Sequence, residues 1–186
     1  TITYIQGGQI WKATVRGLSG DNPKLVKRTQ LSNVPNGIGE FKLSPDEKSL
    51  MYISYVKSDV KTAKDSDPKL DKADAYVAED LMYRHWDHWV TELPHTFVAK
   101  LGSEITPDNS IDILANEEKL YELPTEPHGG LEQLDWTPDG KYIAYSCKKK
   151  TGKEYAFSTN TEIYIYNVAD GTCTVIPMGG GYDTNP

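Results

Sequence analysis

The residues of this sequence best suited to binding chemistry are an acid and two aromatic residues close together, Glu154, Tyr155 and Phe157. A carboxylate accepts charge-assisted hydrogen bonds from an ammonium group. The three residues lie in a stretch between two strand-like segments, and ligand sites on rigid β scaffolds often use such loops. We therefore predict that Glu154, with Tyr155 and Phe157 as aromatic walls, helps to bind the amino group of a substrate.

Carboxylate pairs also occur elsewhere in the chain. We interpret them as solvated surface, because charged side chains are seldom buried without a partner. A functional carboxylate in one of these pairs would have to face a substrate amino group, as proposed for Glu154. The pairs are Asp65 and Asp67, Glu79 and Asp80, and Glu117 and Glu118.

Two histidines have a spacing that occurs in metal sites. His85 and His88 are three residues apart on a segment with helical spacing, and His95 follows farther on. Zinc sites use such spacings. A surface helix turn with aromatic anchors explains the same residues, and neither a cysteine nor a second carboxylate pair completes a ligand set. We therefore predict no metal and no other cofactor.

No nucleophile has the surroundings that catalysis requires. The nearest approach to the nucleophile elbow of serine hydrolases is residues 17–21 (GLSGD), which lack the final glycine and lie between two predicted strands. Cys147 and Cys173 fall on alternate strands of one predicted sheet, about 9–10 Å apart, which is too far for a disulfide. We expect both thiols to be free and mostly buried, and we predict no catalytic residue in this chain.

A β-hairpin at residues 134–145 (LDWTPDGKYIAY) is the element around which the rest of the chain is arranged. At its turn (TPDG), proline presets φ, aspartate closes a local turn and glycine accepts a positive φ. The aromatic and apolar flanks suit half-buried strands. Residues 44–52 (SPDEKSLMY) repeat the turn and the second strand, and residues 181–186 (GYDTNP) align with residues 130–135 (GLEQLD). Units of about 40–50 residues with about four strands each are typical of propeller blades.

We therefore predict an all-β fold, a partial β-propeller of about three four-stranded blades with a short helical insertion. The predicted strands are residues 2–5, 9–15, 24–29, 41–43, 50–56, 96–101, 110–114, 133–136, 141–147, 162–168 and 172–176. The predicted parts are the end of a first blade (1–34), a second blade with an insertion at about 57–94 (35–130), a third blade (131–178), and the start of a truncated next blade (179–186).

The insertion interrupts the strand pattern. Residues 57–74 are polar and rich in aspartate and lysine, which predicts a mobile loop. Apolar residues from 73 to 90 recur at three- and four-residue spacings, which favours a short amphipathic helix.

Composition excludes several classes of partner. The 186 residues are 38% hydrophobic and 25% charged, and no apolar run approaches the ~20 residues of a membrane span. The formal net charge of -7 argues against nucleic acid, since phosphate binding favours a basic face. The three lysines at 148–150 suit a solvated hairpin loop. No signal peptide is visible, so we expect that any targeting segment has been lost.

The motifs resemble those of a known family. The LDWTPDGKYIA stretch resembles the PD40-type, WD40-like blade motif shared by TolB-type propellers and the N-terminal propellers of S9 (prolyl-oligopeptidase-family) serine peptidases. Three further segments are similar to the bacterial dipeptidyl-peptidase or acylaminoacyl-peptidase branch of that family. They are residues 83–89 (YRHWDHW), 127–133 (PHGGLEQ) and 157–164 (FSTNTEIY).

The resemblance implies an N-terminal propeller followed by a C-terminal α/β-hydrolase domain that carries Ser, Asp and His. None of that second domain is in this sequence. The implied role of this part is to gate peptide access and to help bind the substrate N-terminus, in a periplasmic or secreted hydrolase. The alternative is a TolB-like propeller that serves as a protein-interaction platform without enzymatic activity. A downstream Gly-x-Ser-x-Gly with Asp and His in the reading frame would decide for the peptidase.

A propeller cut at a blade boundary would leave apolar faces and strand edges without neighbours. We therefore expect this chain to self-associate.

Overall fold

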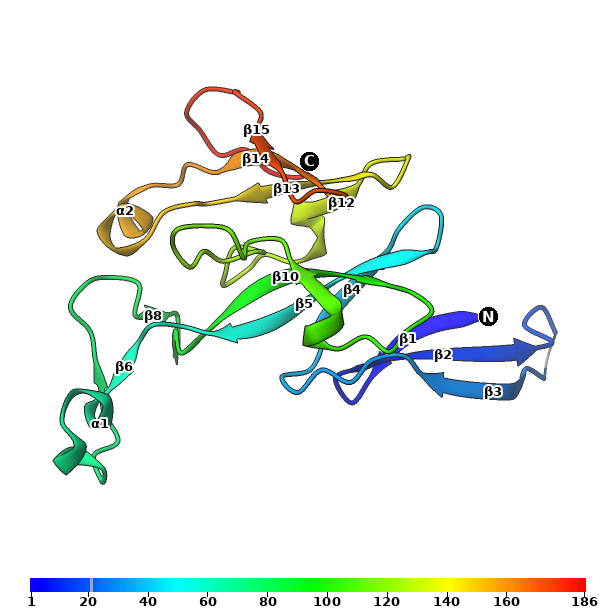
Figure 1. Cartoon of the computed structure of the whole chain (residues 1–186), viewed down its shortest axis with the longest axis horizontal. Helices are drawn as coiled ribbons and strands as arrows, with labels where there is room; N and C mark the ends of the chain where they lie inside the picture. Colours follow the sequence, from blue (N-terminus) through cyan, green and yellow to red (C-terminus); the bar gives the residue numbers. More distant parts are fainter. Residues whose placement is uncertain (21) are drawn as a thin grey trace.

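The computed structural model describes residues 1–20 and 22–186, so residue 21, the last of the GLSGD loop, lies outside the described residues. Three antiparallel sheets make up most of the molecule (Figure 1). The first sheet has the order β1 (Ile2–Gln6), β2 (Gln9–Arg16), β3 (Lys24–Gln30). The second has the order β11 (Ser110–Asp112), β10 (Glu92–Lys100), β5 (Ser49–Lys57), β4 (Glu40–Leu43). The third has the order β12 (Leu134–Trp136), β13 (Tyr142–Cys147), β14 (Glu162–Asn167), β15 (Cys173–Val175).

The predicted all-β class is confirmed, because each predicted strand has a counterpart in these sheets. The described residues do not close into a ring of sheets. Among those same residues, no helix is long and apolar enough to cross a membrane.

Two of the tight turns are built alike, as their sequence repeat predicted. Ser44 and Thr137 each donate a hydroxyl hydrogen bond of 2.7 Å to the aspartate two residues on, Asp46 or Asp139. Each aspartate also accepts a backbone N–H bond of 3.1 Å from the lysine that follows. These local bonds close the hairpins β4–β5 and β12–β13 and set the register of both pairs.

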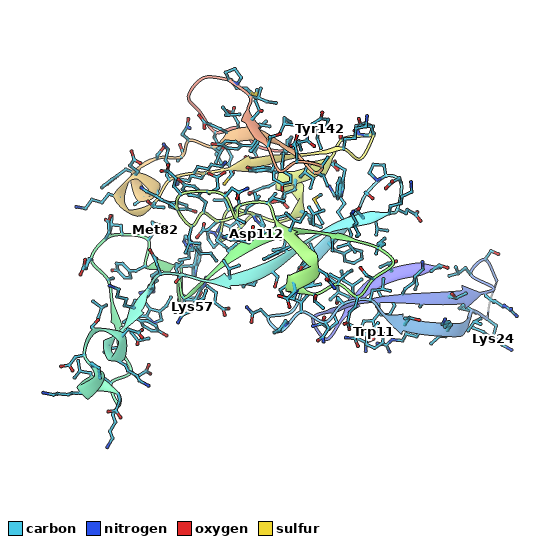
Figure 2. All side chains as sticks on the ribbon, viewed as in Figure 1. Trp11, Lys24, Lys57, Met82, Asp112 and Tyr142 are labelled. Carbon is cyan, nitrogen blue, oxygen red and sulfur yellow. The ribbon has the colours of Figure 1, made fainter. Side chains whose placement is uncertain are left out.

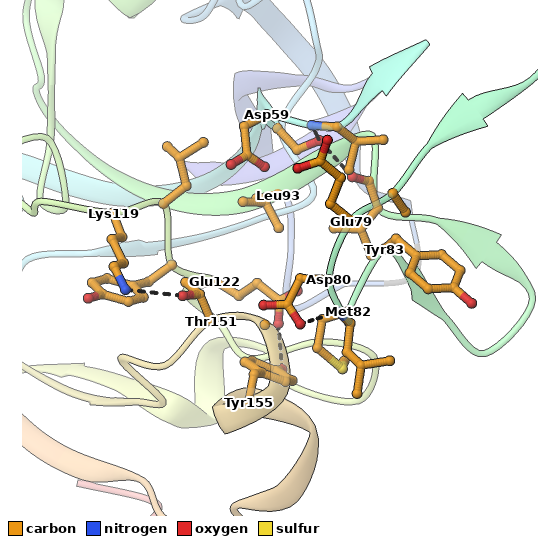
Figure 3. Close-up of a pocket in the computed structure, with 18 of the residues that line it drawn as sticks. Asp59, Glu79, Asp80, Met82, Tyr83, Leu93, Lys119, Glu122, Thr151 and Tyr155 are labelled. Carbon is orange, nitrogen blue, oxygen red and sulfur yellow. Dashed lines mark hydrogen bonds between the residues drawn. The ribbon is translucent and has the colours of Figure 1, made fainter. Parts of the chain in front are cut away.

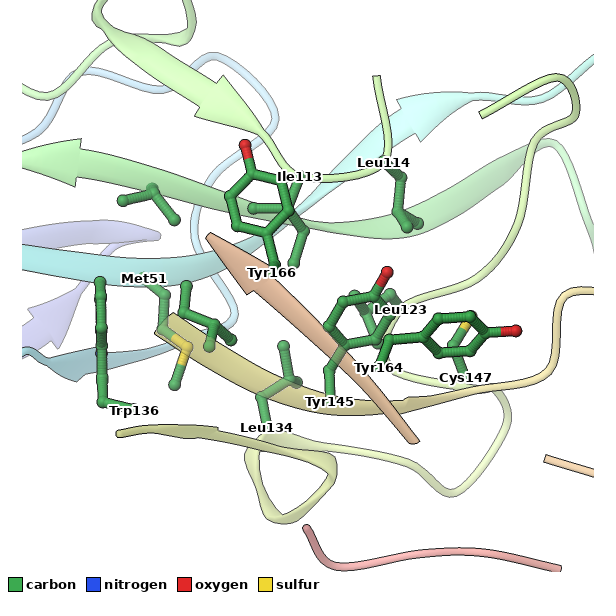
Figure 4. Packing of buried hydrophobic residues seen from close by; sticks show 12 residues of the cluster. Met51, Ile113, Leu114, Leu123, Leu134, Trp136, Tyr145, Cys147, Tyr164 and Tyr166 are labelled. Atoms are coloured by element: carbon green, nitrogen blue, oxygen red, sulfur yellow. The ribbon is translucent and has the colours of Figure 1, made fainter. Parts of the chain in front are cut away.

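Two clusters of buried side chains hold the sheets together. One joins the second and third sheets and includes Met51, Leu134 and Trp136 (Figure 4). The other joins the first and second sheets and includes Ile10 and Tyr52. The second sheet is thus packed on both faces, and the burial of apolar surface on each side stabilises its position.

Residues 58–91, called the insertion below, project from the ends of β5 and β10 (Figure 1). In Figure 2, Met82 of the insertion lies on the left side of the molecule and Lys24 of β3 at its right end. The residues expected as a loop, 57–74, contain two short helices, and the helix predicted over residues 73–90 is wrong. The elements of the insertion are β6 (Lys61–Thr62), α1 (Ala63–Ser66), η1 (Pro68–Leu70), β7 (Tyr76–Val77), β8 (Arg84–His85) and β9 (His88–Trp89).

Backbone conformation explains why residues 73–90 form no helix. Met82 and Trp86 have φ values of 64° and 43°, a region that interrupts a right-handed helix and that bulky residues rarely adopt. Around these two residues the chain folds into the short hairpin β8–β9. Tyr83 and Trp89 stack on each other, with ring centroids 5.9 Å apart, instead of facing a core.

A second correction concerns the segment between β13 and β14, which was predicted as a loop. It contains the short helix α2 (Gly152–Phe157), which begins at Gly152 with φ 58°. Whether a side chain of α2 points inward therefore depends on the face of the helix on which it lies.

Candidate functional site

A cavity of about 610 Å³ lies between stretches of the chain that are far apart in sequence. Its walls come from the insertion, from residues 118–122 and from the turn into α2 at residues 150–155 (Figure 3). Five acids and three lysines line it, together with apolar side chains such as Leu81, Met82 and Leu93. The surplus of carboxylates beside an apolar wall suits a ligand that carries both a cationic group and an apolar one. The lining acids are Asp59, Glu79, Asp80, Glu118 and Glu122.

Asp80 and Glu79 are exposed acids on the insertion side of the cavity. Asp80 Oδ1 accepts the backbone N–H of Leu81 at 2.8 Å, which orients the carboxylate. A Cβ added at Gly152 would overlap Asp80 Oδ2, so the acid stands directly against the first residue of α2. The Glu79 carboxylate accepts no hydrogen bond from the described residues and can therefore receive one from a ligand.

Glu122 is the buried acid of the cavity, with 6% of its surface exposed. Its Oε1 is hydrogen-bonded to Nε2 of His85, which is also buried. Its Oε2 accepts the Tyr155 hydroxyl at 2.6 Å and the Glu126 backbone N–H at 3.2 Å. Burial and the adjacent Glu122 carboxylate raise the pKa of Tyr155 far above its usual value, so the Tyr155 hydroxyl keeps its proton and donates.

The predicted site residues Glu154, Tyr155 and Phe157 are not brought together. Tyr155 is buried and lines the cavity, whereas Glu154 is exposed and Phe157 has 84% of its surface in contact with solvent. They diverge because the segment is helical, so adjacent residues point in different directions. Their role in binding stays a prediction.

Sequence signals are weaker for the residues that the cavity does bring together. Glu79 and Asp80 form one of the carboxylate pairs interpreted as solvated surface, and their exposure agrees with that interpretation. Glu122 stood in an irregular connection with no pattern to single it out. Only the packing of His85 and Tyr155 against it reveals its position.

The three predicted candidate histidines are separated. His85 and His88 face each other across the hairpin β8–β9, with ring centroids 6.2 Å apart. His95 lies on β10, and its Nδ1 is bonded at 2.7 Å to Asp112. Across the described ranges, no group of three histidine, cysteine, aspartate or glutamate side chains is arranged to hold a metal ion.

Two nucleophilic side chains at or near the cavity, those of Ser58 and Cys147, are engaged or buried. Ser58 lines the cavity, but its hydroxyl donates to the Val90 carbonyl at 2.6 Å. Burial raises the pKa of Cys147 to about 12, which suppresses its thiolate. The prediction that Cys147 and Cys173 are free is confirmed, whereas the expectation that both are buried is wrong for Cys173, which is exposed.

Comparison with known proteins gives this geometry a context. No protein-family model matches the chain. Dipeptidyl-peptidase 5 of Porphyromonas endodontalis is 44% identical over 165 residues, which cover 88% of this chain and 23% of that protein. Dipeptidyl-peptidase 5 of Porphyromonas gingivalis is 44% identical over 151 residues, 81% of this chain and 22% of that protein. The chain is similar to dipeptidyl-peptidase 5.

The similarity to dipeptidyl-peptidase 5 extends beyond bacteria. The protein of that name from Arthroderma otae is 26% identical over 184 residues, 95% of this chain and 25% of the relative. The chain thus spans about a quarter of the length of the curated relatives it matches. Similarity of this extent supports the interpretation of the chain as a fragment of a peptidase-related protein. The remaining three quarters of dipeptidyl-peptidase 5 lie outside the comparison.

Proposed function

We propose that this chain is the propeller part of an S9-family serine exopeptidase of the dipeptidyl-peptidase type. The 44% identity with dipeptidyl-peptidase 5 from two bacteria carries the proposal. In this proposal the reactive serine belongs to a C-terminal α/β-hydrolase domain of the parent protein, and the propeller gates the access of peptides to it. The Ser58 hydroxyl on the cavity wall donates to the Val90 carbonyl, which agrees with such a division of labour.

The proposed blades correspond to the three sheets. The second and third sheets each have four antiparallel strands. In the third sheet the strands follow one another in chain order, as they do in a propeller blade. The proposed boundaries stay those predicted from the sequence, with a first blade ending at 34, a second over 35–130, a third over 131–178 and a further one from 179.

The cavity is the proposed place for the substrate N-terminus. Glu79 and Asp80 are exposed carboxylates on its wall, and a peptide ammonium group would donate charge-assisted hydrogen bonds to them. The apolar wall at Leu81 and Met82 suits the first side chain of the peptide. Glu154, exposed on α2 nearby, remains a proposed contributor from outside the cavity.

The test uses the complete protein that contains this chain. We expect it to release dipeptides from chromogenic substrates with a free N-terminus and not from N-acetylated ones. Asp80→Asn is expected to raise KM about tenfold or more with little change in kcat, because one charge-assisted bond to the bound amino group is lost. An unchanged KM in Asp80→Asn would remove the cavity from the proposal, and an unchanged KM in Glu154→Gln would remove Glu154.

The second candidate is a TolB-like interaction platform without enzymatic activity. The exposure of Trp86 (76%) and Phe157 (84%) favours it, since large exposed aromatic residues are frequent at protein interfaces. A parent protein that hydrolyses no dipeptidyl substrate, and whose reading frame lacks a downstream Gly-x-Ser-x-Gly, would decide for the platform.

A further inference from the structure

Among the carboxylates of the cavity, Glu122 differs from the others in that the protein itself supplies all its partners. Three donors converge on it: the imidazole of His85, the hydroxyl of Tyr155 and the backbone N–H of Glu126. With 6% of its surface exposed, the carboxylate has no free side for a ligand amino group. Its function must therefore lie in what it holds in place.

The main chain at Glu122 is itself anchored to both neighbouring sheets. The next residue, Leu123, donates its N–H to the Pro94 carbonyl at 2.8 Å, and its carbonyl accepts the Thr96 hydroxyl at 3.1 Å. Both of these partners lie on β10. The Glu122 carbonyl accepts the Cys147 thiol of β13 at 3.4 Å. Glu122 is thus a rigid point between the second and third sheets.

The two side chains that Glu122 binds belong to two different parts of the cavity wall, the insertion and α2. His85 is the buried residue of the hairpin β8–β9, and Tyr155 is the buried residue of α2. Asp80 and Gly152, which meet at the cavity, lie five residues before His85 and three residues before Tyr155. Whatever fixes His85 and Tyr155 therefore also fixes the distance between Asp80 and the start of α2.

We propose that Glu122 is the positioning residue of the cavity, which fastens the insertion and α2 to the sheets and so sets the place of Asp80. This assignment of the wall stands on geometry, whereas its effect on peptide binding rests on the proposed function. The experiment therefore measures the two separately. Amide hydrogen exchange of residues 80–90 reports how firmly the wall is held, and calorimetry reports the binding of a dipeptide amide with a free or an acetylated N-terminus.

Chemistry predicts different outcomes for two substitutions. Glu122→Leu leaves the His85 imidazole and the Glu126 N–H without an acceptor and the Tyr155 hydroxyl with only the Glu126 carbonyl at 3.2 Å. It is expected to raise exchange of residues 80–90 about tenfold or more. Glu122→Gln can keep the network only with its oxygen toward Tyr155 and Glu126 and its amide nitrogen toward His85 Nε2. That arrangement needs a neutral His85, because a protonated imidazole has no acceptor.

The Gln variant therefore gives a readout that simple destabilisation would not. Relative to the unchanged protein at the same pH, its insertion is expected to stay protected in alkaline solution and to lose protection in acid, because an imidazolium cannot accept from the substituted amide. The titratable groups around His85 are Glu122, Tyr155 and, across the hairpin, His88. The unchanged Glu122 carboxylate produces no such loss, since it accepts a hydrogen bond from the neutral and from the protonated imidazole alike.

The matched control is a second tyrosine-to-glutamate bond away from the cavity, that of Tyr164 to Glu162 at 2.8 Å. Tyr155→Phe is expected to loosen residues 80–90 and to weaken binding of the free dipeptide amide severalfold, whereas Tyr164→Phe is expected to do neither. Equal exchange in both variants, or pH-independent protection in Glu122→Gln, would overturn the proposal. If the unchanged protein binds neither dipeptide amide, the proposed function fails while the exchange result still decides the role of Glu122.

Discussion

At the residue scale, the two repeated turns differ where the backbone is left-handed. The third sheet has Gly140 there, with φ 68°, and the second sheet has Glu47, with φ 54°. Glycine adopts this region without steric cost, whereas other residues lose about 1–2 kcal/mol. Gly140→Ala is expected to lower the free energy of unfolding by about 1 kcal/mol, and Glu47→Gly to raise it or leave it unchanged. Urea denaturation measures both.

Space does not complicate this comparison. The nearest atom to a Cβ at Gly140 would be the Pro45 Cδ at 3.7 Å, an ordinary contact. Gly181 is a suitable control, because its φ is not positive and an added Cβ would meet nothing within 4 Å. If Glu47→Gly lowered the free energy of unfolding as much as Gly140→Ala does, the turn would not be strained at Glu47.

Gly152 allows a residue-scale test of the cavity itself. It has φ 58°, and a Cβ there would overlap the Asp80 carboxylate. Gly152→Ala is therefore expected to displace Asp80 and to weaken dipeptide-amide binding about tenfold or more. Gly179→Ala is the control, since Gly179 has φ 87° and open space around it. Calorimetry of both variants separates the effect of displacing Asp80 from the effect of placing alanine at a positive φ. Equal binding by the two variants would mean that the position of Asp80 does not affect the binding of the dipeptide amide.

At the scale of the elements, three turns share an acid-sensitive bond. Hydroxyl hydrogen bonds from Ser44, Thr137 and Thr172 hold the pKa of Asp46, Asp139 and Asp170 below their usual range. A carboxylate with a lowered folded pKa adds stability above its unfolded pKa of about 3.9, and this stability is lost as pH falls through the folded value. The free energy of unfolding is therefore expected to fall below about pH 4.

The contribution of one turn can be isolated with Asp139→Asn. Its urea midpoint is expected to be lower than that of the unchanged protein at pH 7, and the difference is expected to shrink as pH falls through the lowered folded pKa of Asp139, where the aspartate takes up its proton. Asp108→Asn serves as the control, because the Asp108 side chain has no hydrogen-bond partner in the described part of the chain. A constant difference between pH 7 and pH 3 would contradict the role of the ionised turn.

Some elements of this molecule could be predicted from the sequence, and others could not. Strands such as β5 and β13 were predictable, since their alternation and their TPDG-type turns are local signals. The hairpin β8–β9 was not, because its three- and four-residue spacing of apolar residues imitates a helix. Its fold depends on positive φ values at Met82 and Trp86 and on the burial of His85, which only tertiary contacts impose.

The candidate site was less predictable for a related reason. The acid with aromatic neighbours, Glu154, was recognisable, but its direction depends on a helix of six residues with no marked pattern. The partners of Glu122 come from residues 85, 126 and 155, and no local period links such distant positions. Sites assembled across a fold therefore escape prediction from one sequence, whereas the scaffold that assembles them does not.

At the scale of the whole molecule, exposed apolar side chains predict association. Leu25 and Val26 on the outer strand β3 are 61% and 50% exposed, and Met178 beyond β15 is 58% exposed. Outer strands that offer both apolar side chains and unpaired backbone groups favour contact with another chain. We expect concentration-dependent association in analytical ultracentrifugation, weakened by Leu25→Lys and Val26→Lys. A monomer at high concentration would count against it.

The strand β5 predicts how the molecule unfolds. Its consecutive residues Leu50, Met51 and Tyr52 are at most 1% exposed, with Met51 in the cluster toward the third sheet and the other two in the cluster toward the first. A strand packed on both faces couples its neighbours, so loss of one contact should weaken all three sheets together. Met51→Ala is expected to lower the free energy of unfolding by about 2–5 kcal/mol, through lost burial and a cavity.

The coupling is tested by comparing probes of the same Met51→Ala variant. Far-ultraviolet circular dichroism reports all strands. Tryptophan fluorescence reports Trp11 and Trp136 in the first and third sheets, together with Trp86 and Trp89 of the insertion, so one shared transition is expected with both probes. Leu25→Ala, at an exposed position, should change stability by less than about 0.5 kcal/mol. Two separate transitions would mean that the sheets unfold independently, because β5 would then not transmit the loss of Met51 to the first sheet.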